Sequence, residues 1–353
     1  MRAGSREAGE TAARKRDPPL SATVFDFALE TCAAFGKGLR GGGGEGKMGG
    51  AGDDKMNPMV KQAAAAAWLP WARWRKGGGL LVLTFHRVRP REGRQPGEME
   101  NLTVAPEDFR GLLEWMSRRW SPVGVDEWYA MGEEAESRCS TRSRGWFAVT
   151  FDDGWADNWR YAAPVLKELG VPATVFLATA AVEERRPFWW MGCGLPDGEI
   201  EAKKRALPGA LEREVRAEAG APGGEEFLTW EDIGAWARQG GVKFGLHGHS
   251  HALLDAMGRA EALEDLQRCW RLVREKVPEG ARSAFLAWPN GNWREDLATE
   301  LDGLGVAGAF STRRGIAWPS MEGRWRLPRY NVDAGLAADE RLWPWMAVNA
   351  WRS

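Results

Sequence analysis

From residue 80 onward, short runs of apolar residues alternate with longer segments whose apolar positions recur at helical spacing. An unbroken apolar run of about five or six residues is typical of a strand that is buried on both faces. Such runs predict strands at residues 80–85, 146–151, 173–177 and 284–288, and less uniform apolar segments predict strands at 242–246 and 307–311. Apolar spacings of three and four residues predict helices at residues 109–119, 158–169, 231–239, 263–277 and near 295–304.

This alternation predicts an α/β fold, with a parallel sheet wrapped by helices. The number of strand–helix units favours a barrel over an open sheet. In barrels of this kind the chemistry lies just beyond the C-terminal ends of the strands. We therefore expect polar clusters directly after the apolar runs.

Outside the main domain, which we expect at residues 80–335, the chain follows other patterns. Residues 1–55 are rich in glycine and charge, so they are expected to be a disordered, dispensable leader, and Met56 or Met59 is an alternative start. Residues 56–79 predict a linker or an amphipathic helix. Within the domain, residues 183–226 interrupt the alternation and predict an insertion over one side of the site. Residues 336–353 are expected to form a C-terminal tail.

Residues 62–74 need comparison with a signal peptide, because Lys61 precedes a short alanine-rich run. Pro70 interrupts that run and no clean cleavage site follows. An interfacial anchor and a helix that covers one end of the domain are the two remaining interpretations. The expected location is therefore cytoplasmic or peripheral to the membrane.

Composition removes several classes of function. Lys and Arg total 48 and Asp and Glu total 49 of 353 residues, so no basic excess indicates a nucleic-acid partner. The four cysteines contain no C-x-x-C pair, which argues against a disulfide framework and a cysteine-rich zinc module. No apolar run approaches the ~18 residues of a membrane span. The 21 tryptophans suggest stacking surfaces for sugars, with a coding bias as the alternative.

Candidate chemistry gathers at the ends of predicted strands. The sequence has four histidines, of which His86 ends one predicted strand and His247, His249 and His251 follow another. Asp152 and Asp153 also end a strand, and two adjacent carboxylates are costly to bury without compensation. A divalent cation is one compensation, while capping of the next helix is the plain structural alternative. Two imidazoles four residues apart, together with a carboxylate, make a facial set of metal ligands.

The motifs TFDDG at 150–154, H-x-x-x-H at 247–251 and FLAWPNG at 285–291 resemble those of polysaccharide deacetylases of the NodB-homology type, carbohydrate esterase family 4. LTFHRV at 83–88, FWW at 188–190 and LPR at 327–329 are similar to further motifs in a bacterial subgroup. The likeness extends over about residues 80–331. It implies a distorted (β/α) barrel of about seven parallel strands.

The resemblance also implies roles for individual residues. Asp153, His247 and His251 would bind one divalent metal ion, with zinc favoured and cobalt, nickel or iron as alternatives. Asp152 would be the general base that activates water. A backbone N–H near Trp288 would help to hold the oxyanion, and Asn290 and Trp189 belong to the same substrate and oxyanion region.

Several positions depart from the family pattern. Gly248 stands where a Ser or Thr hydroxyl usually braces the loop, and Ala287 stands where an Arg usually holds the base. Arg329 could take over that role, with a structural salt bridge as the alternative. No histidine follows His251, so the general acid is assigned to His86. His249 is then either a supporting residue or merely exposed.

These observations predict a metal-dependent hydrolase that removes N-acetyl groups from a glycan. Its partner would be an acetylated oligo- or polysaccharide, and the sequence leaves the oligomeric state open. A deformylase or O-acetyl esterase acting on a sugar, and a non-catalytic glycan-binding module, are the alternatives. The paired aspartates and histidines argue against a non-catalytic module, because such a module does not need them.

Overall fold

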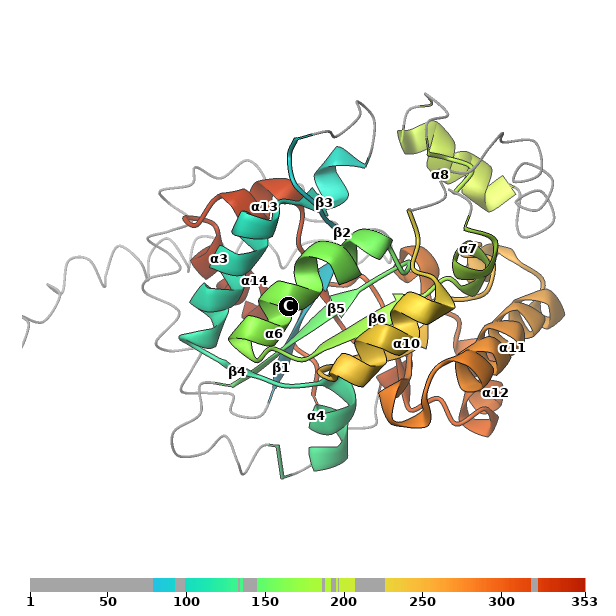
Figure 1. Cartoon of the computed structure of the whole chain (residues 1–353). Helices are drawn as coiled ribbons and strands as arrows, with labels where there is room; N and C mark the ends of the chain where they lie inside the picture. The colour runs from blue at the N-terminus through green and yellow to red at the C-terminus, as the bar shows by residue number, and fades with distance from the viewer. Residues whose placement is uncertain are drawn as a thin grey trace, which may run out of the picture. The chain divides into compact units, whose positions relative to one another are not determined.

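Parallel strands form the centre of the molecule, and helices surround them (Figure 1). The computed structural model describes residues 79–92, 99–132, 134–135, 145–185, 188–191, 195, 197–206, 226–318 and 323–352. All of these lie in the second of two units of the chain, Asn57–Ser353. The expected leader and most of the expected linker fall outside the described residues, as does much of the insertion.

The sheet follows a single path of seven parallel strands in the order β10-β1-β5-β6-β7-β8-β9, and β4 pairs with β5 beside this path. The strands of the path are β1 Leu80–Phe85, β5 Trp146–Phe151, β6 Ala173–Leu177, β7 Val242–Leu246, β8 Arg282–Ala287, β9 Gly308–Phe310 and β10 Tyr330–Asn331. The three short strands are β2 Arg87–Val88, β3 Thr103–Val104 and β4 Ser121–Pro122. The predicted barrel of parallel strands is confirmed.

The helices of the described residues are α3 Pro106–Ser117, α4 Val125–Met131, α6 Ala163–Leu169, α7 Thr179–Glu184, α8 Asp197–Ala206, α10 Trp230–Gln239, α11 Arg259–Lys276, α12 Ala298–Gly303, α13 Ala334–Ala338 and α14 Trp343–Arg352. Helix α10 begins at a capping box in which Thr229 and Asp232 bond each other's backbone N–H groups. The predicted helix at 158–169 is split into a π-helical turn, Asn158–Ala162, and α6. Pro164 in the first turn of α6 has no N–H and helps to explain this break. Gly170 ends α6 in the left-handed conformation, as its position in the sequence predicts.

Side chains of alternate strand residues belong to two different cores. Leu81, Leu83 and Phe85 of β1 join the cluster that includes the helices, whereas Leu80 and Val82 join a second cluster. That second cluster also takes Ala148, Phe176, Phe285, Ala287, Phe310 and Leu327. Because side chains alternate between the faces of a strand, this second cluster marks the inside of the curled sheet.

One segment joins the two ends of the sheet path. Ser311 donates its N–H to Leu327 O and Leu327 donates to Ala309 O, which ties the segment to β9. Three residues beyond Leu327, β10 pairs with β1 through Tyr330 and Leu83. This segment therefore links β9 to β10 and closes the ring of strands. Arg329 lies within the segment, and because it is two residues after Leu327, its side chain points inward as that of Leu327 does.

The C-terminal helix contributes to the core. Trp343, Met346, Ala347 and Ala350 of α14 are buried in the same cluster as α3, and Trp343 lies 6.0 Å from Trp115, ring centroid to centroid. None of the helices in the described part of the chain combines the length and apolar character that a membrane crossing requires.

Candidate functional site

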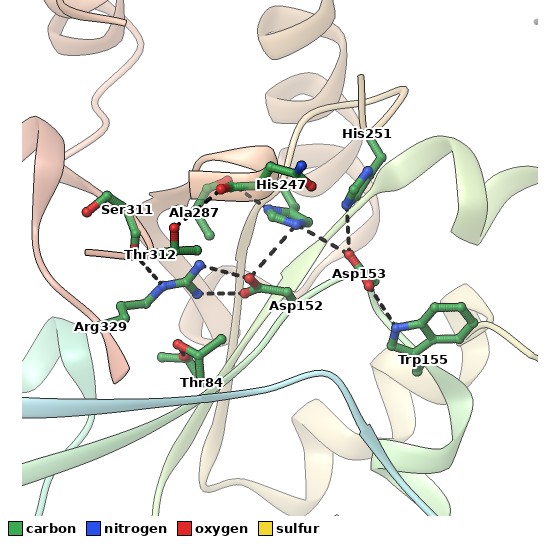
Figure 2. Close-up of polar contacts among 12 residues, drawn as sticks. Thr84, Asp152, Asp153, Trp155, His247, His251, Ala287, Ser311, Thr312 and Arg329 are labelled. Atoms are coloured by element: carbon green, nitrogen blue, oxygen red, sulfur yellow. Dashed lines mark hydrogen bonds and ion pairs between the residues drawn. The ribbon is translucent and has the colours of Figure 1, made fainter. Parts of the chain in front are cut away.

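Asp152 points into the barrel because it continues the inward alternation of Ala148 and Thr150 on β5. Arg329 reaches it from the closing segment and donates from Nη1 to Oδ1 at 2.7 Å and from Nη2 to Oδ2 at 2.8 Å. Both side chains are buried, and the guanidinium also lies over the Phe176 and Phe310 rings. The base candidate is thus held by a two-point ion pair inside the barrel (Figure 2).

Asp153 turns away from this interior. Its φ is 76°, in the left-handed region that a non-glycine residue seldom occupies, and Gly154 continues the turn at 88°. The carboxylate Oδ2 accepts a hydrogen bond of 2.8 Å from Trp155 Nε1. Its Oδ1 lies 3.3 Å from His247 Nε2 and 3.0 Å from His251 Nε2 (Figure 2). Asp153, His247 and His251 therefore offer three ligand atoms within 4.8 Å of one another, as the sequence predicts for a metal site.

The donor atoms of this cluster fit a cation. His247 Nδ1 donates to Ala287 O at 2.8 Å, so a neutral His247 ring directs an unprotonated Nε2 at Asp153. Within the described residues Asp153 Oδ1 has no hydrogen-bond partner, although it is buried. A lone pair facing a carboxylate oxygen is repulsive unless a proton or a cation lies between them. Three nitrogen and oxygen ligands at this spacing suit a divalent metal ion with further positions open.

Electrostatics favour charged carboxylates in the site. Burial would raise the pKa of Asp152, but Arg329 and His247 outweigh it and hold that pKa below its ordinary value. Burial opposes ionisation of Asp153 in the same way, yet His251 and His247 lower its pKa further. Burial lowers the pKa of His251 to about 4. At neutral pH His251 therefore carries a free ring lone pair, as a metal ligand must.

Asp265 of α11 supports the loop between the two histidines. Its Oδ1 accepts from the His249 N–H at 2.6 Å and its Oδ2 accepts from the Ser250 N–H at 2.9 Å. Gly248 has a φ of 74°, and a Cβ there would lie 2.9 Å from Asp265 Oδ1. The carboxylate of Asp265 therefore braces the loop, and at Gly248 it leaves no room for a side chain. His249 is buried and forms a hydrogen bond of 2.9 Å with Thr179, so it supports this loop and is not exposed.

Aromatic rings from the predicted insertion cover His251. Phe188 lies 4.6 Å and Trp190 5.3 Å from the His251 ring, between centroids. Trp189, the residue that the sequence favours for substrate contact, stacks edge-on against Trp190 at 5.6 Å. Helix α8 joins this cover, with Lys204 over Trp190. The described part of the insertion therefore lies beside the candidate metal ligands, through Phe188 and Trp190.

The turn after β8 carries the candidate oxyanion residues. The N–H of Trp288 donates to Phe310 O at 3.0 Å, and its indole donates to Trp325 O at 2.7 Å. Sheet pairing uses the N–H of Trp288 itself, so an oxyanion donor near Trp288 would be another N–H of this turn. Pro289 has no N–H, so the next donor along the turn is Asn290, whose φ is 56° and whose side chain bonds Glu201 of α8.

His86 follows β1, at the same end of the sheet as Asp152. Its side chain is half-buried, and Nδ1 is a buried atom with no hydrogen-bond partner among the described residues. The charge of His86 also lowers the pKa values of both aspartates, after the larger effects of their nearer partners. Sequence patterns singled out His86 and Arg329 as candidates, whereas Trp155 and Asp265 were missed. A sign of Asp265 is present: it is an acid inside the apolar stripe of α11, beside Leu266 and Cys269.

The fold and this cluster together describe a barrel protein with a candidate metal centre at its C-terminal rim. The sequence model of the family described as polysaccharide deacetylase matches residues 140–309. This segment of the chain is similar to the polysaccharide deacetylases, the family that the motifs predict.

Solved structures with the same fold include a Streptococcus pyogenes deacetylase, PplD, in complex with acetate. The similarity covers 73% of this chain and 94% of PplD, with 17% identity and a TM-score of 0.53. IcaB from Ammonifex degensii gives the same TM-score at 20% identity, over 76% of this chain and 98% of IcaB. A curated relative from Bacillus subtilis (strain 168), YxkH, is named provisionally as a polysaccharide deacetylase. It is 24% identical over 111 residues, which are 30% of this chain and only 34% of YxkH.

Proposed function

We propose that this protein is a metal-dependent hydrolase that removes N-acetyl groups from a glycan. One observation carries the proposal: Asp153 Oδ1 and two histidine Nε2 atoms converge beside a second carboxylate, Asp152, that is held separately by Arg329. The cluster lies at the strand ends of a fold that the deacetylase PplD shares. The match to the polysaccharide deacetylase model supports a glycan as the substrate class.

Asp153, His247 and His251 would hold the cation. When bound, a divalent cation supplies Lewis acidity, which polarises an acyl carbonyl and makes a water molecule easier to deprotonate. The identity of the metal is part of the proposal, with zinc favoured because nitrogen and oxygen ligands in a set of three suit it.

Asp152 is the proposed general base. A carboxylate whose pKa is lowered by Arg329 is a weak base, so it can remove a proton only from a water that is already acidified. Its place beside the cation ligands meets this need, because Asp152 Oδ2 lies 4.0 Å from His247 Nε2. Arg329 keeps Asp152 charged and prevents its rotation, and we propose that it replaces the arginine that many relatives carry at position 287.

His86 is the proposed general acid for the leaving nitrogen. An amine leaves poorly without a proton, so hydrolysis of an amide needs a donor near the departing atom. The buried, unpartnered Nδ1 and the influence of His86 on both aspartates support its presence at the site. The N–H of Asn290 is the proposed donor for the oxyanion.

Acetate release from a panel of acetylated glycans tests this function. The purified protein is stripped with a chelator and then supplied with zinc, cobalt, nickel or iron. We expect acetate release only after a metal is added, and faster release from N-acetylated than from O-acetylated sugars. Formate release from a formylated sugar, with none from the acetylated panel, would favour a deformylase. Glycan binding without any release would contradict the enzymatic proposal.

A further inference from the structure

The indole of Trp155 lies between the candidate metal centre and a buried ion network. Its Nε1–H donates to Asp153 Oδ2 at 2.8 Å, and the residue is completely buried. A buried indole usually finds a partner for its N–H, but here the partner is the one carboxylate that faces two histidines. The contact therefore divides the two oxygens of Asp153: Oδ2 accepts from Trp155, while Oδ1 has no hydrogen-bond donor in the described structure.

Groups on both faces keep the Trp155 ring in place. Phe227 stacks on it at 4.3 Å with an angle of 23° between the ring planes. The Arg87 guanidinium lies 4.4 Å from the same centroid, and two such groups cannot share one face. Backbone pairing between Trp155 and Phe227 fixes the ring further, since Ala156 N donates to Glu226 O and Leu228 N donates to Gly154 O. The ring therefore cannot swing away from Asp153 without opening the core around it.

Arg87 is itself fixed by two carboxylates. Its Nε donates to Asp157 Oδ2 at 2.7 Å, and its Nη2 forms an ion pair with Glu226 Oε2 at 2.8 Å. Asp157 also accepts from the Val88 N–H. The network holds the guanidinium over the indole, where the cation is attracted to the ring. Strand β2, the turn after β5 and the chain that returns from the insertion thus meet at Trp155.

We propose that Trp155 is a positioning residue for the cation site: its N–H holds Asp153 so that Oδ1 alone is presented to the metal. This inference rests on the proposed metal-dependent function. A carboxylate without this restraint could rotate and offer both oxygens, which larger ions with flexible coordination accept. With Oδ2 engaged, Asp153 binds through one oxygen, and the site favours a small ion with few ligands.

A pair of substitutions separates the N–H from the packing of the ring. In histidine, Nε2 is two bonds from Cγ, as Nε1 is in tryptophan, so Trp155→His can present an N–H in the same direction. Trp155→Phe fills more of the space but has no donor. Packing alone therefore predicts that Trp155→Phe is the better replacement, whereas the proposed role predicts that Trp155→His is. Trp236→Phe, which truncates another buried indole packed against Phe244, is the matched control.

Zinc affinity is measured by competition with a chromophoric chelator, and the Co²⁺-loaded proteins are compared by visible absorption. We expect Trp155→Phe to weaken zinc binding roughly 10- to 100-fold, as is typical for loss of an outer-shell partner. Trp155→His should recover part of that loss with one cation per chain, and Trp236→Phe should match the wild type. The Co²⁺ spectrum should change in Trp155→Phe alone of these three variants.

Equal zinc affinities for Trp155→Phe and Trp155→His would overturn the proposal, and so would wild-type affinity in Trp155→Phe. If Trp155→Phe does not fold, Trp155→Met takes its place as the donor-free partner. A wild-type protein that binds neither zinc nor Co²⁺ would instead contradict the metal-dependent function itself, which keeps the two failures distinct.

Discussion

The surroundings of Asp152 and of Asp153 differ in almost every respect, although the two residues are neighbours in the chain. Asp152 faces the barrel interior, where Arg329 binds both of its oxygens. Asp153 leaves the strand with a φ of 76° and lies among two imidazoles and an indole. The difference teaches that one strand end can supply two carboxylates with separate chemistry, provided that the backbone turns sharply between them.

The two carboxylates also differ in the positive charge that compensates each of them. Arg329 neutralises Asp152 permanently, because a guanidinium does not lose its proton in proteins. The pKa of His251 is lowered to about 4, so at neutral pH this imidazole brings no positive charge to Asp153, and a cation held by the cluster would supply it. A fixed positive charge beside Asp152 and a set of candidate cation ligands around Asp153 give each of the two buried carboxylates its own means of compensation.

The largest expected effects on metal binding and turnover come from substituting Asp153 and Asp152 separately. Asp153→Ala should abolish zinc binding and with it all turnover, because it removes the central ligand. Asp152→Asn should keep zinc but lower turnover roughly 10²- to 10⁴-fold, since an amide cannot accept the proton. Metal content and acetate release are measured on both variants. Loss of zinc in Asp152→Asn would show that the two carboxylates act as one unit and would remove the distinction drawn above.

A substitution at His86 is expected to have an effect that depends on the substrate. His86→Ala should retain zinc and should lower amide deacetylation roughly 10²- to 10⁴-fold, the usual contribution of a general acid. Hydrolysis of an activated aryl acetate should fall much less, because that leaving group departs without a proton. Initial rates on the two substrates give the comparison. Equal losses would refute the acid role, and loss of metal would make His86 a ligand.

Much of this arrangement can be read from the sequence, for physical reasons. Strands β1, β5, β6 and β7 have the predicted ends, because their residues are almost all buried, and a polar residue directly follows β1, β5 and β7. The metal cluster follows from the same logic, since parallel strands bring their C-terminal ends to one edge. Strand ends alone could therefore place the aspartate pair near His247 and His251, whereas the choice of Asp153 over Asp152 as the ligand came from the family resemblance.

Other parts could not be predicted in this way. Strand β10 has two residues, too few to show a pattern, yet its approach segment closes the ring and carries Arg329. Trp155 reaches Asp153 only because the left-handed turn at 153–154 folds the chain back. Asp265 is 14 residues beyond His251 in sequence, and only the packing of α11 against β7 and α7 brings it to the histidine loop. These contacts depend on tertiary geometry that local spacing does not encode.

A smaller loss of turnover is expected when the partner of Asp152 is removed. Arg329→Gln should raise the pKa of Asp152, because burial then acts without the compensating charge. Activity needs the carboxylate, so the acid limb of the pH–rate profile should move to higher pH. Arg326→Gln, at an exposed arginine of the same segment, is the control and should leave the profile unchanged. If the acid limb of Arg329→Gln does not move, the ion pair with Asp152 has only a structural role.

Arg329→Gln should also change how the free energy of unfolding depends on pH, and the direction follows from the pKa of Asp152. In the wild type the pKa of Asp152 is lower when folded, so its ion pair contributes fully above the ordinary value of about 4 and is lost as pH falls through the folded value. Breaking a buried pair costs about 3–5 kcal/mol. Denaturant unfolding should therefore show a large difference between wild type and Arg329→Gln at neutral pH, and a smaller one in strong acid.

The smallest effect should come from a single methyl group beside the Asp153 site. Gly248 and Gly305 both have positive φ, 74° and 81°, but a Cβ at Gly248 would lie 2.9 Å from Asp265 Oδ1, whereas at Gly305 it would meet nothing within 4 Å. Each Gly→Ala change should cost roughly 1–2 kcal/mol of stability for its left-handed backbone. Only Gly248→Ala should also displace the Asp265 carboxylate, loosen the loop between the histidines and weaken zinc binding several-fold. Thermal unfolding and zinc competition on the two variants separate these contributions. Unchanged zinc affinity in Gly248→Ala would mean that the loop holds His247 and His251 without the support of Asp265. The surroundings of Asp153 would then accept an added methyl group more readily than their close packing indicates.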